Sequence, residues 1–447
     1  MSVDISSQMD PALAKAMSQV FSKLREAGFE SYIAGGAVRD AMLGLPVKEV
    51  DIATSAHPED IERLFTKTIP VGKQFGVMIV VENEAQFELT TFREEAGYSD
   101  GRHPDKISFS NARSDVLRRD FTINGLFFDP ISDQLLDFCD GAHDIKRGLI
   151  RTIGDPQQRF KEDSLRVLRA IRFASQFEFR IDDKTWQSLC QEATGLNRVS
   201  QERIGEELLK ILTGEGAHRA LRLLLETGIL EIILPEVAKM DGIKQPPQFH
   251  PEGDVFTHTC LLFELSTRPS PTLALGMLLH DVGKPPTFIV KDRIRFDRHA
   301  EVGAEMASGI CKRLRISRKD TESVIELVKQ HLRFINVMEM RDSKLKRFLR
   351  QPNFQEHLEL HRLDCLASHG NLSAHAFCSA KLHDFGPEDV RPEPLINGRD
   401  LIALGLTPGP QFSEILTRLE DLNLENVLSS KEDALLWVQN HFLRENL

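Results

Sequence analysis

The sequence predicts an α+β fold, in which a small sheet-containing head is followed by a long helical body. Short strand-like runs alternate with helical segments from residue 31 to about 145, as in a small sheet covered by helices. From about residue 146 onward, strand-like runs nearly vanish and apolar residues recur at helical spacing almost to the C-terminus. Segments with turn-forming residues at 234–254, 284–287 and 386–398 interrupt this helical part.

The expected elements follow one another along the chain. Residues 11–28 are predicted to form an amphipathic helix that leads into the first strand. The strand-like runs of the head are SYIAGG, VDIAT, VMIVV, QFELTTF, GLFFDP and QLLDFCD. In the helical part, SLRVLRAIRFASQF and IGEELLKIL show apolar residues at helical spacing.

The composition is that of an ordinary globular chain. Its 447 residues suffice for two to four domains. No apolar run is long enough to span a bilayer, and the N-terminal MSVDISSQMD lacks the apolar stretch of a signal peptide. Six scattered cysteines without a CxxC pair indicate reduced thiols in the cytoplasm, and they argue against a zinc cluster or a disulfide framework.

The net charge of −11 argues against a protein that is basic over its whole surface. Nucleic-acid binding stays open because it depends on local charge, and residues 146–180 and 312–350 are locally rich in lysine and arginine. A solvated helix face is the alternative explanation of each basic stretch.

A glycine pair after the first strand suggests a phosphate site. Gly35 and Gly36 leave backbone N–H groups open to an anion, and a helix that begins there and carries Arg39 adds positive potential. An ordinary turn is the alternative for a lone glycine pair. The next strand carries Glu49 and Asp51, whose side chains share one face of a strand and can hold a hard cation such as Mg²⁺. Together they indicate a triphosphate–metal site, although the spacing does not name the reaction.

Two further clusters of charged residues are candidates for nucleotide binding. Arg118 and Arg119 can bind phosphate while Asp120 accepts a hydrogen bond from a ribose hydroxyl; an exposed helix start is the alternative. Further on, Asp163 and Arg166 present an acceptor and a donor fork that match the edge of a base. The polar stripe that they would form on one helix continues through Arg169 and Arg172, and ordinary salt bridges are the alternative.

These motifs, in this order, resemble the class II tRNA nucleotidyltransferase and bacterial poly(A) polymerase family, within the polymerase-β-like nucleotidyltransferase superfamily. The matching segments are Gly35–Asp40 with Glu49–Asp51 for catalysis, Arg118–Asp120 for ribose selection, Asp129–Asp137 for the link to the neck, Glu162–Arg166 for nucleotide selection, and Ser200–Leu208 for stabilising the neck. One position departs from the pattern: the family usually has Asp where this chain has Glu49. Asp51 is therefore the safer metal ligand, and Glu88 is a candidate third carboxylate, with a surface role as its alternative.

The resemblance implies a reaction, its partners and its metal. The enzyme would transfer nucleotides from CTP and ATP to the 3′ end of tRNA, with Asp163 and Arg166 acting as an amino-acid template. Asp51 and Glu49 would hold two Mg²⁺ ions between the primer hydroxyl and the α-phosphate. Gly36 and Arg39 would steady the triphosphate. Residues 93–104 resemble the family's flexible loop, whose DGRHP ending favours an enzyme that adds the terminal A.

A second constellation lies in the helical body. His258, His280, Asp281 and Asp364 resemble the core of the HD metal-dependent phosphohydrolase domain. Further members are Lys284, His299 and His331. Imidazoles and carboxylates suit Mn²⁺, Ni²⁺, Fe²⁺ or Mg²⁺. The implied activity is that of a phosphatase or phosphodiesterase, and a degenerate helix bundle is the alternative.

The resemblance also divides the chain. It implies a nucleotidyltransferase head over 1–145, a nucleotide-selecting neck over 146–215, a helical body with the HD domain over 216–390, and a helical tail over 391–447. The tail would contact tRNA, and packing against the body is its alternative role.

CCA addition is the leading functional hypothesis, and several others stay open. An A-adding enzyme working with a CC-adding partner would share the same motifs. The acidic charge argues against a poly(A) polymerase. An HD hydrolase with an RNA-binding head, or a non-catalytic RNA-binding module, would not need Asp51, Arg118, Arg119 and Asp163 together.

Overall fold

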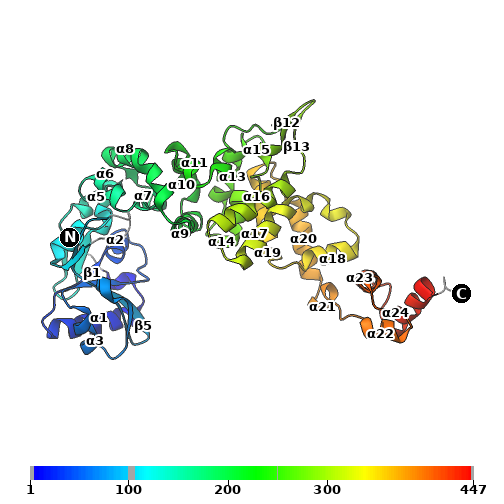
Figure 1. Ribbon diagram of the computed structural model, residues 1–447, viewed down its shortest axis with the longest axis horizontal. Helices are drawn as coiled ribbons and strands as arrows, with labels where there is room; N and C mark the ends of the chain where they lie inside the picture. The colour runs from blue at the N-terminus through cyan, green and yellow to red at the C-terminus, as the bar shows by residue number, and fades with distance from the viewer. Residues whose placement is uncertain (1–4, 99–105, 249, 444–447) are drawn as a thin grey trace. The chain divides into compact units, whose positions relative to one another are not determined.

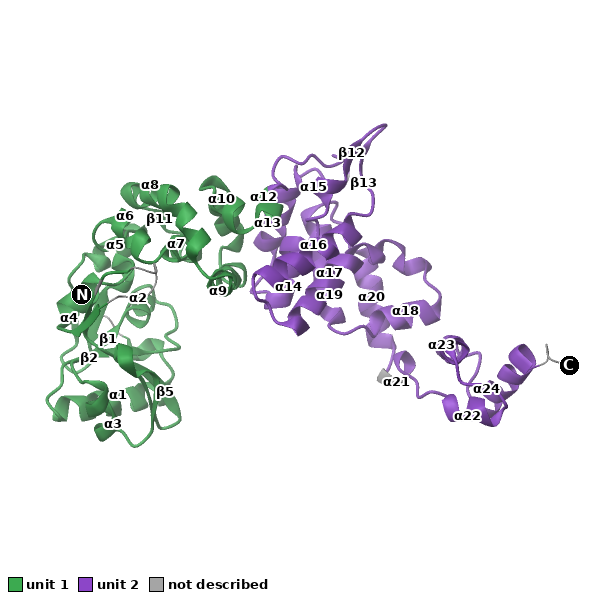
Figure 2. Cartoon of the chain, viewed as in Figure 1, with its two compact units in different colours: residues 1–238 green, residues 239–447 purple. Residues whose placement is uncertain are grey.

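A computed structural model describes residues 5–98, 106–248 and 250–443, and it divides the chain into two compact units, residues 1–238 and 239–447 (Figures 1 and 2). The first unit contains the main sheet, and the second is almost entirely helical. The predicted α+β organisation, with strands concentrated before residue 146, is confirmed. Among the described residues, no helix is long and apolar enough to cross a membrane.

Seven strands of the first unit form one sheet in the order β3-β4-β5-β2-β1-β8-β9. Only β2 and β5 pair in parallel in this sheet, and the other neighbouring pairs are antiparallel. The strands are β1 (Ser31–Ala34), β2 (Asp51–Thr54), β3 (Thr68–Gly72), β4 (Val77–Glu82), β5 (Ala85–Thr91), β8 (Leu126–Asp129) and β9 (Gln134–Asp137). The six strand-like runs seen in the sequence all became strands, and β3 was not predicted.

Helix α1 (Pro11–Glu26) is the predicted amphipathic helix, and Asp10 caps its N-terminus by accepting from the N–H groups of Ala12 and Leu13. Its buried residues, such as Val20 and Phe21, pack where the helix meets strands β1, β4 and β5. A separate two-stranded hairpin of β6 (Arg93–Ala96) and β7 (Lys106–Phe109) follows β5. The predicted flexible loop over residues 93–104 therefore begins with a strand, and its DGRHP ending lies outside the described residues.

Helices build the rest of the first unit. They are α2 (Gly36–Met42), α3 (Pro58–Leu64), α4 (Ala112–Leu117), α5 (Gly141–Arg147), α6 (Pro156–Glu162), α7 (Arg166–Gln176), α8 (Asp183–Glu192), α9 (Gln201–Leu212), α10 (Ala217–Glu226), α11 (Ile229–Ile233) and α12 (Pro235–Ala238). The short strands β10 (Leu149–Ile150) and β11 (Arg180–Ile181) pair in parallel beside α7. Helix α7 buries Val167, Leu168 and Ile171 in the core, and its arginines are available to line the cavity described below.

The second unit is a helical domain with one small hairpin. Its helices are α13 (Val255–Leu265), α14 (Pro271–Leu279), α15 (Lys284–Thr287), α16 (His299–Arg313), α17 (Arg318–Gln330), α18 (Asp342–Leu349), α19 (Phe354–Ala367), α20 (Ser373–Asp384), α21 (Pro387–Val390), α22 (Gly398–Ala403), α23 (Pro410–Leu424) and α24 (Lys431–Val438). The hairpin is β12 (Phe288–Val290) with β13 (Ile294–Phe296). A 3-10 segment, His331–Glu339, follows α17.

The last three helices have a core of their own, which includes Ile396, Leu401, Ile415 and Leu419. Helix α23 is also tied to α18, because Arg347 and Arg350 both pair with Glu420. The tail therefore packs against the body through α23, as the alternative prediction stated. This packing does not test the predicted contact with tRNA.

Candidate nucleotidyl-transfer site and HD metal centre

One cavity in the first unit collects most of the candidate nucleotide-binding residues. It has a volume of about 980 Å³ and opens between the sheet and the helices that follow it. Arginines outnumber carboxylates on its walls, which favours a polyanionic ligand. The charged residues that line it are Arg39, Asp51, Glu88, Arg93, Glu95, Arg118, Arg119, Asp120, Asp163, Arg166, Arg169, Arg172 and Arg203, and Gly35 and Gly36 line it as well.

Gly35 turns the chain from β1 into α2. Its φ of 63° lies in the left-handed region, and it is the N-cap of a helix that begins at Gly36. A Cβ atom at Gly35 would lie 3.0 Å from Nη1 of Arg119. The glycine therefore allows both the turn and the close approach of the arginine.

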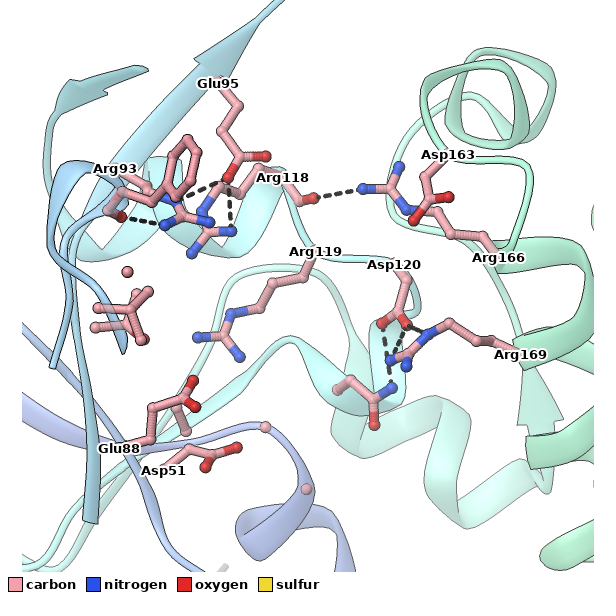
Figure 3. A pocket seen from close by; sticks show the side chains of 18 of the residues that line it. Asp51, Glu88, Arg93, Glu95, Arg118, Arg119, Asp120, Asp163, Arg166 and Arg169 are labelled. Atoms are coloured by element: carbon pink, nitrogen blue, oxygen red, sulfur yellow. Dashed lines mark hydrogen bonds and ion pairs between the residues drawn. The ribbon is translucent and has the colours of Figure 1, made fainter. Parts of the chain in front are cut away.

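The carboxylates of two neighbouring strands meet on the cavity wall. Strand β2 begins at Asp51, and its parallel partner β5 places Glu88 directly opposite. Val50, Ile52, Phe87 and Leu89 are buried, so Asp51 and Glu88 face away from the core and into the cavity (Figure 3). Glu88, which the sequence offered only as a third carboxylate, is thus the cross-strand neighbour of Asp51.

Glu49 lies before β2 and not on it, so the prediction that one strand carries both carboxylates is wrong. The residue is exposed and lies outside the cavity lining. Its charge still reaches the other two carboxylates, because it contributes to their raised pKa values. The chain takes up β pairing only at Asp51, where the partner strand β5 provides a hydrogen-bonding neighbour.

The electrostatics of the carboxylates fit a divalent cation. Burial raises the pKa of Asp51, Arg119 works against that rise, and Glu49 adds to it. Burial also raises the pKa of Glu88, and the charges of Asp51 and Glu49 raise it further, whereas Arg93 lowers it. Two carboxylates that disfavour each other's ionisation are stabilised when a cation binds between them, and oxygen ligands are those that Mg²⁺ prefers.

Arg118 and Arg119 are held by one buried carboxylate, that of Asp115 on α4. Arg118 Nε donates to Asp115 Oδ1 at 2.8 Å, and Arg119 Nη2 donates to Asp115 Oδ2 at 3.1 Å. Arg118 also donates to Glu95 Oε1 at 3.0 Å. Figure 3 shows the Arg119 guanidinium extending toward Asp51 and Glu88. The sequence contained the signal for Asp115, since it precedes the two arginines by three and four residues on a helix.

Asp120 is buried and already engaged within the protein. Its Oδ2 accepts from Arg169 Nε at 2.8 Å, and its Oδ1 accepts from Asn124 Nδ2 at 3.1 Å. Burial alone would raise the pKa of Asp120, but the Arg169 guanidinium and the hydrogen bonds hold it well below its usual range. These contacts support a role for Asp120 in positioning Arg169, beside the predicted contact with a ribose hydroxyl.

Polar contacts continue from Asn124 to helix α2. Asn124 Oδ1 accepts from Arg39 Nη1 at 2.6 Å, and Arg39 also donates to Asp40. The Arg39 guanidinium lies over the rings of Phe173 in α7 and of Phe177, which caps the C-terminus of that helix, at 5.2 and 4.7 Å from their centroids. Arg39 is therefore buried between α2 and α7, and it links the glycine turn to the helix that carries Arg166 and Arg169.

Asp163 and Arg166 are not on one helix, so the predicted helical stripe is wrong at its first member. Helix α6 ends at Glu162, and Asp163 has extended backbone angles before α7 begins at Arg166. The Asp163 carboxylate pairs with Arg203 of α9 through two hydrogen bonds of 2.8 and 3.2 Å. Arg203 lay in the Ser200–Leu208 motif, but its contact with Asp163, forty residues away, could not be read from the sequence.

The remaining members of the stripe do lie on α7 and line the same cavity. Arg166 donates to Glu162 Oε2 at 2.9 Å and to the carbonyl of Arg118 at 3.2 Å (Figure 3). Arg172 donates to the buried Glu207 of α9 at 2.6 Å. Residues of α6 and α9 therefore hold these arginines on one side, and their guanidinium groups line the cavity on the other.

The second unit brings the HD residues together from several helices. His258 comes from α13, His280 and Asp281 follow α14, and Asp364 is on α19. His258 Nε2 lies 3.0 Å from Asp364 Oδ1, and His280 Nε2 lies 3.2 Å from Asp281 Oδ2. The nitrogen and oxygen atoms of His258, His280 and Asp364 lie within 4.8 Å of one another, which is the spacing of a shared metal ion.

Three histidines of this centre are oriented by the backbone. His280, His299 and His331 each place Nδ1 within 2.6 to 2.9 Å of the carbonyl oxygen three residues earlier. A carbonyl can only accept, so Nδ1 carries the hydrogen and Nε2 is left with its lone pair. Each Nε2 faces Asp281, at 3.2, 3.5 and 3.9 Å respectively.

A nitrogen lone pair and a carboxylate repel each other, and a cation between them removes that repulsion, so these residues fit a metal ion. Within the described part of the chain, Nε2 of His280 and Nε2 of His299 are buried without a hydrogen-bond partner. Burial lowers the pKa of His331 to about 4, and it also lowers that of His299, which keeps both rings neutral as metal ligands must be. The ammonium of Lys284 already contacts Asp281, at 2.6 Å.

Comparison with known proteins places both sites in a family. Residues 31–151 match the model of the poly A polymerase head domain, residues 178–240 that of a probable RNA- and SrmB-binding site of polymerase A, and residues 255–367 that of the HD domain. A CCA-adding enzyme of Ligilactobacillus salivarius is 33% identical over 92% of this chain and 93% of the relative. The chain belongs to the family of CCA-adding enzymes. A second family member, from Lactobacillus helveticus, is 33% identical over 94% of the chain and 95% of its own length.

Solved structures agree with this family. The CCA-adding enzyme of Bacillus stearothermophilus in complex with CTP superimposes with a TM-score of 0.76 at 25% identity, covering 98% of this chain and all of that one. The Thermotoga maritima CCA-adding enzyme complexed with tRNA shares the fold, with a TM-score of 0.61 at 20% identity over 98% of both chains. The resemblance inferred from the motifs is confirmed, as is the predicted fold of a nucleotidyltransferase head followed by a helical body with an HD domain.

Proposed function

We propose that this chain adds C, C and A to the 3′ end of tRNA, using CTP and ATP, and that the cavity of the first unit is where it does so. The observation that carries this proposal is the content of one cavity: Asp51 and Glu88 on one wall, and Asp163 and Arg166 on another, with Arg118 and Arg119 between them (Figure 3). A metal site, a triphosphate site and a base-reading pair in one cavity are what a polymerase without a nucleic-acid template needs.

Divalent-metal chemistry belongs to nucleotidyl transfer of this class, and we assign two Mg²⁺ ions to the site. Asp51 and Glu88 would hold them, with Glu49 as the further ligand that the motif indicates. When bound, the ions lower the pKa of the attacking hydroxyl and offset the charge of the triphosphate. The Mg²⁺ preference for carboxylate oxygens supports this set of ligands.

The protein's own residues position the nucleotide. Arg118 and Arg119 are oriented by Asp115, so their guanidinium groups can bind the triphosphate without losing much conformational freedom. Gly35 and Gly36 leave room for the phosphates beside α2. Alignment of the α-phosphate with the primer hydroxyl, more than proton transfer by a side chain, would supply most of the rate.

Asp163 and Arg166 would read the base. The Asp163 carboxylate offers acceptors and the Arg166 guanidinium offers donors, and these groups match the edges of cytosine and adenine. Because Arg203 fixes Asp163 with two hydrogen bonds, its remaining acceptor positions keep a defined direction. The same pair serves an A-adding enzyme equally well, so A addition alone is the alternative outcome.

We propose that each of the four predicted segments has its own function. We assign nucleotidyl transfer to residues 1–145, nucleotide selection to 146–215, the HD centre to 216–390 and tRNA contact to the tail over 391–447, with the enzyme acting in the cytoplasm. The cavity is lined from the first two of these segments, which supports a joint active site.

A second activity is favoured by the HD centre. Four histidines and two aspartates converge there, and Nε2 of each histidine lies 3.0 to 3.9 Å from a carboxylate oxygen. We assign a divalent ion to His258, His280, Asp281 and Asp364, with Mn²⁺, Ni²⁺, Fe²⁺ and Mg²⁺ as candidates. When bound, such an ion activates water for hydrolysis of a phosphate ester. Phosphomonoesters and 2′,3′-cyclic phosphates are the substrate classes to test.

One experiment tests the main proposal. The protein is incubated with tRNA transcripts that lack CCA, that end in CC and that carry the complete CCA, with CTP and ATP supplied separately and together. Extension of the first transcript to CCA supports the proposal. Extension of only the CC-ended transcript would establish A addition instead, and no extension of any transcript would contradict nucleotidyl transfer to tRNA.

A further inference from the structure

The segment before α13 sends three side chains into the HD centre. Gln245 is 4% exposed, and its Oε1 accepts from Lys284 Nζ at 2.7 Å. Glu252 places Oε1 at 2.7 Å from His258 Nδ1 and at 2.8 Å from His250 Nδ1. The segment has little regular structure, so these contacts are what fix its described residues against the centre.

His258 differs from the other histidines of the centre in how its ring is held. His280 and His331 are C-caps and His299 is the first residue of a helix, so each finds a carbonyl with spare acceptor capacity three residues earlier. His258 lies inside α13, where the carbonyl of Val255 accepts from the Thr259 hydroxyl at 2.9 Å. Its ring therefore needs a partner from outside the helix.

Glu252 is the charged group nearest to Nδ1 of that ring, at 2.7 Å, although neither ring nitrogen of His258 makes a hydrogen bond of regular geometry to a described residue. Its side chain is 7% exposed, and its second oxygen, Oε2, is buried with no hydrogen-bond partner among the described residues. A buried carboxylate is stabilised by charge-assisted donors, and the two histidine Nδ1 atoms are the donors within reach. With its hydrogen on Nδ1, His258 directs Nε2 at Asp364, 3.0 Å away.

We propose that Glu252 is a positioning residue of the HD metal centre, which holds His258 in the tautomer that offers Nε2 to the metal. This inference rests on the proposed metal centre and extends it beyond His258, His280, Asp281 and Asp364. A carboxylate on the far nitrogen of a ligating histidine fixes the ring and increases its basicity, and the loss of such a partner typically weakens metal binding by about 10- to 100-fold.

The test measures metal affinity in the full-length protein. Ni²⁺ and Mn²⁺ binding are followed by titration calorimetry for the unsubstituted protein, Glu252→Gln, Glu252→Asp and His250→Ala. Glu264→Gln is the matched control, because Glu264 is an exposed residue on the same helix as His258. Thermal unfolding and nucleotidyl transfer to tRNA verify that each variant is folded. Cobalt-substituted protein adds a spectroscopic readout, since its visible absorption reports ligand geometry.

We expect Glu252→Gln to bind both metals about 10- to 100-fold more weakly and to change the cobalt spectrum. Glu252→Asp keeps the charge and should restore part of the affinity, whereas Glu264→Gln should match the unsubstituted protein. Unchanged affinity in Glu252→Gln would overturn the inference while leaving the metal centre intact. An equal loss in His250→Ala would overturn it as well, because Glu252 and His250 would then be ligands themselves. Failure of the unsubstituted protein to bind either metal would instead refute the centre on which the inference rests.

Discussion

The two sites of this chain hold their charged groups in opposite ways. In the nucleotide cavity, charged side chains are oriented by partners from distant parts of the chain: Asp120 holds Arg169, Glu207 holds Arg172, and Arg203 holds Asp163. In the HD centre, three histidines are each held by the backbone carbonyl three residues before them. The first arrangement depends on long-range packing, and the second is almost entirely local.

The difference reflects what each site must bind. A triphosphate and a base are large and change from one addition to the next, so the cavity of about 980 Å³ keeps several charges exposed to its interior. A metal ion is small and needs ligands fixed to a fraction of an ångström, so the imidazoles of the HD centre are buried, and the backbone sets the tautomers of His280, His299 and His331. Loss of an orienting partner such as Arg203 should therefore impair nucleotide selection in the transfer site, whereas three histidines of the HD centre keep their orientation without help from another side chain.

The largest effect is expected from substitutions that disable one of the two sites and leave the other intact. Asp51→Ala should lower nucleotide incorporation by about 1,000-fold or more, because it removes the charge that holds the catalytic metal. Binding of tRNA, measured by filter binding, should stay largely intact. The double substitution His280→Ala with Asp281→Ala is the reciprocal control, and it should abolish metal-dependent phosphatase activity while incorporation continues. Normal incorporation by Asp51→Ala would refute the assignment of the transfer site.

A smaller effect is expected when Asp163 loses its support. Arg203→Ala leaves the base-reading carboxylate in place but removes both hydrogen bonds that direct it. Discrimination between correct and incorrect nucleotides should fall by about 10-fold or more, since a buried donor–acceptor match is worth roughly 1–3 kcal/mol. The ratio of kcat/KM for CTP, ATP, UTP and GTP measures this. An equal loss of rate for all four nucleotides, with selectivity unchanged, would argue for a purely structural role.

The roles of Glu88 and Glu49 can be ranked against each other. Glu88 lines the cavity opposite Asp51, whereas Glu49 is exposed and outside the lining. Glu88→Gln should therefore reduce incorporation more than Glu49→Gln, with an expected difference of about 10-fold, or 1.4 kcal/mol in the activation free energy. Glu49→Asp, which restores the residue usual in the family, is the matched conservative variant. Kinetics at several Mg²⁺ concentrations check this, and a larger effect of Glu49→Gln would reverse the ranking.

A further prediction concerns stability in acid rather than activity. Burial lowers the pKa of His357 and of His361 to about 4, from an unfolded value near 6.5. Between pH 6.5 and 4 the unfolded chain binds more protons at these positions, so the free energy of unfolding of the second unit should decrease as the pH falls through this range. Each unit of pKa difference corresponds to about 1.4 kcal/mol.

Calorimetric unfolding at pH 7 and pH 5 tests this decrease. The double substitution His357→Gln with His361→Gln should show a smaller drop in midpoint temperature than the unsubstituted protein between these two pH values. Asp51→Ala, which changes the first unit only, is the control and should show the full drop. Equal drops in all three proteins would mean that these histidines do not control acid stability.

Local patterns were read correctly from the sequence where local rules decide the structure. The strand-like runs became β1, β2, β4, β5, β8 and β9 because their apolar residues face a common core. Gly35 was recognised as a special backbone position, and it has a positive φ. The prediction failed at Asp163, since helical spacing alone cannot show that the chain leaves one helix and starts another there.

The sequence by itself determined the α+β order of the chain, the glycine turn and the identities of the residues that carry charge into the two sites. Those features depend on periodicity and residue type within about ten positions. Only the tertiary structure decided that Glu88 faces Asp51, that Arg203 holds Asp163 and that Glu252 reaches His258. Strand register, the packing of α9 and the path of the segment before α13 bring these pairs together, and none of them is encoded in the spacing of residues along the chain.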